Sequence, residues 1–83
     1  MEKLIGKVNH YFNKISVAIV ELVDNIRVGN KIKIKDKDRE IEQEVTSLQV
    51  DHQNVQEAKK GEMVGMKVEG KVKEGDEVYL ITE

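Results

Sequence analysis

The chain has 83 residues, of which 39% are hydrophobic and 36% are charged, and its net charge at pH 7 is −2. A chain of this length folds around one core, so we expect a single domain over residues 1–83. Lys and Arg total 14 and Asp and Glu total 16, which excludes the strongly basic class of nucleic-acid clamps. There is no cysteine, which excludes disulfides and thiolate metal sites.

The N-terminal stretch MEKLIGKVNHYFNKI lacks the apolar core of a signal peptide, and no segment of the chain resembles a membrane span. We therefore expect a cytoplasmic protein that does not bind membranes.

Short runs rich in β-branched residues, with apolar side chains at every second position, predict strands with one buried face. In chain order, these strands are expected at residues 3–9, 14–22, 30–36, 39–50, 62–68 and 77–82. The second strand is apolar on both faces from Val17 to Val20, so we expect it to be central and covered on both sides.

The strand at 39–50 changes phase within its length. Its apolar residues occupy odd positions at Ile41 and Val45, then even positions at Leu48 and Val50. A change of phase requires an extra residue, which predicts a bulge or a sharp bend near residues 46–47.

One phrase introduces three of the predicted strands: IRVGNKIKI from Ile26, AKKGEMVGM from Ala58 and VKEGDEVYL from Val72. The copies align on Gly29, Gly61 and Gly75, and each glycine is followed by a polar residue and then by alternating apolar residues. Glycine tolerates a positive φ, and the polar residue can bond to the backbone of the turn. The phrase therefore predicts a tight turn that opens a strand.

A row of lysines resembles a nucleic-acid-binding surface, because alternate residues of a strand face the same way. The lysines are Lys31, Lys33, Lys35 and Lys37, and the following strand has Glu40, Glu42 and Glu44 at the same spacing. If residues 36–39 form the turn and Ile34 faces Ile41 in the core, lysines and glutamates pair across the strands. Such pairs cancel the field of the row and stabilise the hairpin by roughly 0.2–1 kcal/mol each.

The segment Asn54–Lys60, NVQEAKK, is expected to form a helical turn with Asn54 as its cap. Amides, an imidazole and two ammonium groups gather in and around it, where they suit RNA phosphates and base edges or a polar protein surface. The alternative is a plain solvated loop, because Asp51, Glu57 and Glu62 dilute the charge. The candidate binding residues are Gln49, His52, Gln53, Gln56, Lys59 and Lys60.

No motif predicts catalysis. GMKVEGKV, from Gly65 to Val72, lacks the Ser or Thr of a phosphate-binding loop and is expected to be a glycine turn between strands. His10 and His52 lack partners at metal-ligand spacing. We expect no cofactor, no nucleotide, no metal and no enzyme activity.

Four segments together resemble a known family: IGKVNHYFNKISVAIVEL, IRVGNKIKI, VTSLQVDHQNVQEAKKGEMVGMKV and VKEGDEVYLI. The chain resembles stand-alone elongation-factor-like proteins that are built like domain 2 of translation GTPases. It is also similar to the C-terminal domain of some U32-family peptidases. The resemblance implies an all-β fold, a small closed Greek-key β-barrel of about six strands.

In the GTPases this barrel touches ribosomal RNA or tRNA. The resemblance therefore implies a noncatalytic binding module that contacts RNA or the translation machinery through residues 49–60. Val20 stands where elongation factor Tu-like domains usually have glycine, so no residue of their aminoacyl pocket is transferred to this chain. The alternative is a protein-interaction module that docks onto a U32-type peptidase or another enzyme.

Overall fold

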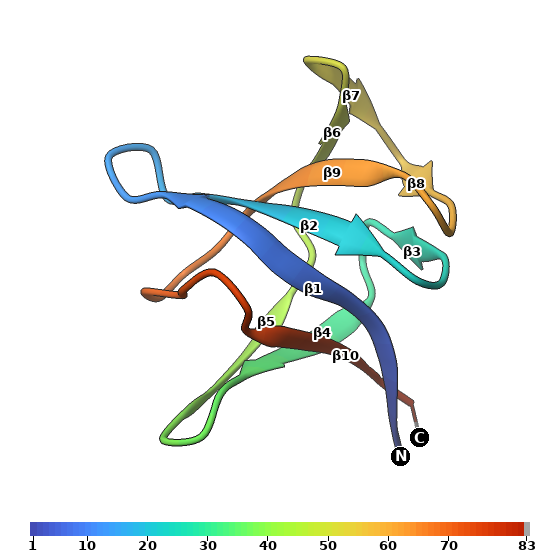
Figure 1. Ribbon diagram of the computed structural model, residues 1–83. Helices are drawn as coiled ribbons and strands as arrows, with labels where there is room; N and C mark the ends of the chain where they lie inside the picture. The colour runs from blue at the N-terminus through green and yellow to red at the C-terminus, as the bar shows by residue number, and fades with distance from the viewer. Residues whose placement is uncertain (83) are drawn as a thin grey trace.

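The computed structural model describes residues 1–82 and is built from strands joined by short turns (Figure 1). The strands are β1 (Glu2–Phe12), β2 (Val17–Leu22), β3 (Ile26–Arg27), β4 (Lys31–Lys35), β5 (Glu40–Glu44), β6 (Leu48–Val50), β7 (Gln53–Val55), β8 (Glu57–Ala58), β9 (Met63–Lys67) and β10 (Glu77–Ile81). The all-β prediction is confirmed. Within residues 1–82 no helix is long and apolar enough to cross a membrane.

Eight strands form one antiparallel sheet in the order β5-β4-β10-β1-β2-β9-β6-β7, and β3 pairs with β8 in a second, two-stranded sheet. The large sheet curls strongly, but β5 and β7 remain its two edges. The closed-barrel and Greek-key parts of the prediction are therefore not confirmed. The side chain of Gln43 in β5 bridges toward the end of β9, because its amide donates to the carbonyl of Lys67 and accepts from the N–H of Glu69.

The concave side of the curled sheet holds a single apolar core. Most of its residues come from strand positions whose side chains point to the concave side. Val45, Val68 and Val72 come from segments between strands. The core consists of Ile5, Val8, Ala18, Val20, Leu22, Ile26, Ile32, Ile34, Val45, Leu48, Ala58, Val64, Met66, Val68, Val72 and Val78. Strand β2 lies between β1 and β9, as expected of a central strand, but only one of its faces is fully buried.

The repeated phrase forms the same turn three times. Gly29, Gly61 and Gly75 have φ values of 98°, 91° and 93°. In each turn the residue after the glycine donates its N–H to the carbonyl three residues earlier, and its side-chain oxygen accepts from the N–H of that earlier residue. A positive φ at the third position is typical of a type II turn, so the prediction is confirmed.

Each turn is also bonded to a neighbouring strand. The glycine donates its N–H to the carbonyl of a residue across the sheet. The N–H of that partner residue donates in return to the carbonyl of the polar residue that follows the glycine. The residues across the sheet are Val45 for the first turn, Leu22 for the second and Val8 for the third. Each of these pairings adds one residue pair to the ladder of the strand that follows the turn. The strands that follow are β4, β9 and β10, in that order.

The secondary structure tests two further predictions, the break within residues 39–50 and the helical turn at Asn54–Lys60. The expected break near residues 46–47 is confirmed, since residues 45–47 interrupt the predicted strand and separate β5 from β6. The expected helical turn at Asn54–Lys60 is wrong, because this segment contributes to β7 and β8, which pair with β6 and β3. Pairing with β3 outweighs the local helical propensity of this segment, and it buries Ala58 in the core.

Replacing Gly75 by Ala should lower the free energy of unfolding by about 1–2 kcal/mol, because an L side chain disfavours positive φ. Steric crowding is not the cause, since a Cβ at this position meets no heavy atom within 4 Å. Gly65→Ala is the matched control, because Gly65 lies in a strand without positive φ and its Cβ would make ordinary contacts. Urea unfolding of both variants checks this, and equal stability would contradict the strained-turn interpretation.

Candidate functional site

The lysine row is paired with glutamates in the predicted register. Residues 36–39 form the turn, where the Asp36 carboxylate accepts from the N–H groups of Asp38 and Arg39. Ile34 lies opposite Ile41. Across β4 and β5, Lys35 lies opposite Glu40, Lys33 opposite Glu42 and Lys31 opposite Glu44. Of these three pairs, Lys33 and Glu42 come within ion-pair distance, at 3.5 Å. The predicted hairpin register is confirmed.

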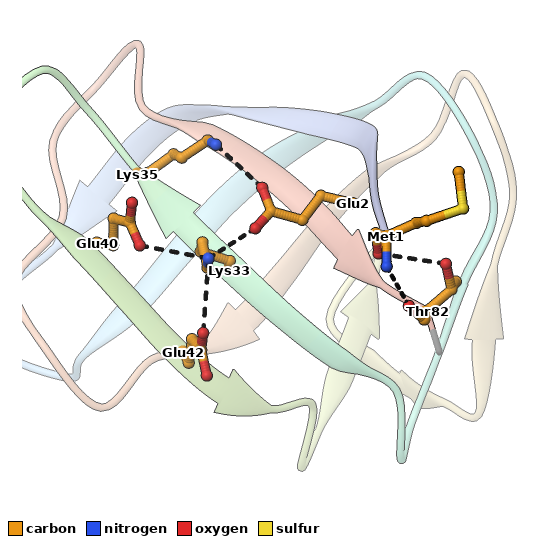
Figure 2. Close-up of polar contacts among 7 residues, drawn as sticks. All are labelled: Met1, Glu2, Lys33, Lys35, Glu40, Glu42 and Thr82. Carbon is orange, nitrogen blue, oxygen red and sulfur yellow. Dashed lines mark hydrogen bonds and ion pairs between the residues drawn. The ribbon is translucent and has the colours of Figure 1, made fainter.

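Glu2 of β1 completes a charge network that the sequence analysis missed (Figure 2). Its carboxylate lies 2.6 Å from Nζ of Lys33 and 3.0 Å from Nζ of Lys35. Lys33 also contacts Glu40 at 3.3 Å and Glu42 at 3.5 Å, and its side chain is only 14% exposed. The central lysines of the row are therefore engaged within the protein and are poorly placed to contact phosphates.

The network also shifts the ionisation of its members. Hydrogen bonds from Lys33, the larger cause, and from Lys35 hold the pKa of the Glu2 carboxyl at about 2, below its ordinary 4.5. The same carboxylate raises the pKa of both lysines. Lys35 in addition lies 4.4 Å above the ring of Tyr79 in β10.

Glu2→Gln should lower the free energy of unfolding at pH 7. Because the pKa of Glu2 is lower in the folded chain, its stabilisation is complete above pH 4.5 and is lost as pH falls toward about 2. The difference between wild type and variant should therefore shrink across that range. Urea unfolding at several pH values measures it, and a difference that does not vary with pH would argue against this role.

A shallow depression of about 300 Å³ lies on the outer surface of the sheet, over β2 and β9. We call it the β2–β9 depression. It is lined by Phe12, Ile15, Val17, Ile19, Gln49, Asp51, His52, Met63, Val64 and Gly65. Phe12, Ile15 and Met63 are 44%, 58% and 45% exposed, and they gather in this one depression, where together they form an exposed apolar patch.

Gly65 of β9 helps to form the floor of the depression. A Cβ at this position would lie 3.5 Å from Val17, 3.7 Å from Ile19 and 3.9 Å from the Cβ of Gln49. These are ordinary contact distances, so the backbone does not require glycine there. A glycine within a strand loses side-chain packing and often marks a place where another group approaches the backbone.

The hairpin between β6 and β7 forms the polar edge of the depression. Asp51 and His52 are its two turn residues, with φ of 51° and 64°, and Val50 pairs with Gln53 on either side of them. Two positive φ values in a two-residue loop indicate a type I′ turn, for which Asn-Gly is the preferred sequence. Both residues of this turn line the depression. Asp suits the first position of such a turn, whereas His52 stands where glycine is preferred.

The structure divides the predicted binding residues into two groups. Gln49 and His52 line the β2–β9 depression, with the Gln49 amide donating to Asn54. Gln53 lies in β7 and Gln56 just after it, both exposed. Lys59 and Lys60 lie in the turn between β8 and β9, where the Lys60 N–H donates to the side chain of Asn25.

The apolar residues of the depression were missed because they are distant in sequence. One signal was present: the run from Val17 to Val20 is apolar on both faces. It was interpreted as a strand covered on both sides, whereas Val17 and Ile19 are half-buried and face the depression. Apolar residues on the outer face of a central strand thus indicate an exposed apolar surface here.

Replacing Asp51 by Asn and His52 by Gly together should raise the free energy of unfolding by about 0.5–1 kcal/mol, since Asn and Gly adopt positive φ more readily. Urea unfolding of the double variant tests this. A loss of stability would mean that the Asp51 or His52 side chain makes a stabilising contact that offsets the backbone preference.

No protein-family model matches the chain. Over 80 residues, 95% of its length, the chain is 44% identical to an uncharacterized protease of Methanocaldococcus jannaschii, and it spans 20% of the length of that protease. Its fold is similar to crystal structures of the C-terminal domain of a Geobacillus thermoleovorans putative U32 peptidase. The TM-score is 0.90 with 14% identity, covering 96% of this chain and 93% of the other.

The selenomethionine variant of that domain gives a TM-score of 0.85 with 15% identity, covering 92% and 96% of the two chains. At these identities the likeness concerns the fold. The comparisons support the U32 part of the resemblance noted in the sequence and give no support to the translation-factor part. The chain thus has the fold of a U32 peptidase C-terminal domain and is homologous to one fifth of an uncharacterized protease.

Proposed function

We propose that this domain is a noncatalytic protein-interaction module that docks onto the remainder of a U32-type peptidase. The observation behind the proposal is that nearly the whole chain matches, at 44% identity, a region that makes up only 20% of a longer protease. In that relative, a domain of this kind is covalently joined to about four times its own length of other polypeptide.

The surface chemistry supports docking over RNA binding. Lys33 and Lys35 are held by Glu2, whereas the β2–β9 depression presents apolar side chains with Gln49 and His52 at its edge. An apolar centre with a polar edge is typical of protein interfaces. RNA binding would instead require several unpaired cations aimed at phosphates.

The proposal is tested with the M. jannaschii protease from which the region of similarity has been deleted. The 83-residue protein, added separately, should bind this truncated protease, as measured by calorimetry and by co-elution in size-exclusion chromatography. Ribonuclease should not affect binding, and raising salt from 50 to 200 mM should change the affinity little, because few phosphates are involved.

Absence of binding to the truncated protease would count against the proposal. Binding to cellular RNA, with an affinity that falls by about 10³-fold or more over the same salt range, would favour the translation-related function instead.

A further inference from the structure

We infer that the β2–β9 depression is the docking surface and that its occupant is an apolar side chain on a segment of the peptidase chain. This inference rests on the proposed function and adds the place and chemistry of the contact. The depression combines an exposed apolar lining, a floor without a side chain and a polar edge.

The apolar lining is concentrated on one side of the molecule. Six large hydrophobic side chains are exposed within residues 1–82, and three of them, Phe12, Ile15 and Met63, line this depression. The outer surface of β4 and β5 is different, because Lys33 and Lys35 form a network with acidic side chains there. An apolar partner surface therefore finds complementary chemistry over β2 and β9.

The floor at Gly65 leaves room for an inserted side chain. Its neighbours Val17 and Ile19 would tolerate a methyl group at ordinary contact distance, so the fold itself does not demand a glycine. The resulting hollow is large enough for one side chain of a partner rather than for a drug-sized ligand, which usually occupies a more enclosed cavity.

The polar edge indicates what accompanies the apolar side chain. Asp51 is the one carboxylate among the lining residues, and the β6–β7 turn places it and His52 at the margin of the depression. A carboxylate accepts hydrogen bonds, so the occupant is expected to have a donor, an amide or a cation, next to its apolar residue.

We assign the occupant to the peptidase because, in the M. jannaschii relative, the matching region is part of the same chain as the rest of the protease. The matched region is one fifth of the M. jannaschii protease, so the remaining four fifths of that chain is always present at high effective concentration. The covalent link raises the local concentration of that remainder at this surface and so adds to the affinity of the contact itself.

A matched pair of variants tests the inference in the binding assay with the truncated protease. Ile15 and Val23 are both exposed aliphatic residues, at 58% and 51%, but Ile15 lines the depression and Val23 does not. Ile15→Lys should weaken binding about 10-fold or more, as expected when an interface centre is disrupted, whereas Val23→Lys should change it less than about 2-fold. Both variants should unfold at the same urea midpoint.

Gly65→Ala tests the floor of the depression without adding charge. The methyl group should leave the folded state intact and weaken binding several-fold, because it occupies space that the partner side chain needs. The Asp51→Asn, His52→Gly double variant should also bind more weakly although it unfolds at higher urea concentration. Unchanged binding by Gly65→Ala would overturn the insertion of a side chain at this point.

The outcomes separate this inference from the proposed function. If the wild type does not bind the truncated protease, the proposed function fails. If the wild type binds but Ile15→Lys and Val23→Lys bind equally well, docking stands and the depression is not its site. If replacing Lys59 and Lys60 by Glu abolishes binding while Ile15→Lys does not, the contact lies at the turn between β8 and β9.

Discussion

This fold depends on three reciprocal pairs of backbone hydrogen bonds. Each pair joins a glycine turn to a residue within a neighbouring strand or, for Val45, just after one. In every case a glycine with positive φ donates to a carbonyl across the sheet, and the residue across the sheet donates back to the residue after the glycine. An isolated turn would leave these backbone groups to water, and burying them unpaired would be costly. Because both groups are bonded, the turn determines where the next strand begins and which strand it joins.

This constraint also places the apolar surface. The Gly61 turn is bonded to Leu22 at the end of β2, so β9 runs antiparallel to β2 from its first residue. That pairing brings Gly65 opposite Ile19. Strand β6 then pairs with β9 and positions Gln49 opposite Gly65, which places the β6–β7 turn at the margin of the depression.

The outer surface of the curled sheet is consequently divided by chemistry. Over β4, β5 and β10, charged side chains contact one another, and Glu2 joins Lys33 and Lys35 (Figure 2). Lys35 also lies above the ring of Tyr79. Over β2 and β9 the outward residues Val17, Ile19 and Met63 are apolar, and Met63 is 45% exposed. A small domain whose core is already complete does not need a second apolar surface for stability, which is why we assign this one to a partner.

The sequence by itself determined the local features, because their causes are local. A glycine followed by a polar residue specifies each turn within four residues, and period-two charge alternation specifies the register between Lys33 and Glu42 once the intervening turn is known. The all-β class follows from the same patterns. The misassigned segment at Asn54–Lys60 shows the limit, because its helical propensity was weak and its pairing with distant strands decided its conformation.

Only the tertiary structure decided which surfaces form. Phe12 and Met63 are 51 positions apart in the chain, and Glu2 and Lys33 are 31 apart, so no pattern within a strand could bring either pair together. Strand order also separated Gln49 and His52 from Lys59 and Lys60, although all four belong to one short stretch of sequence. Adjacency in a β-sheet depends on long-range pairing, and the alternation of side chains reveals which face is buried but not which strand will be the neighbour.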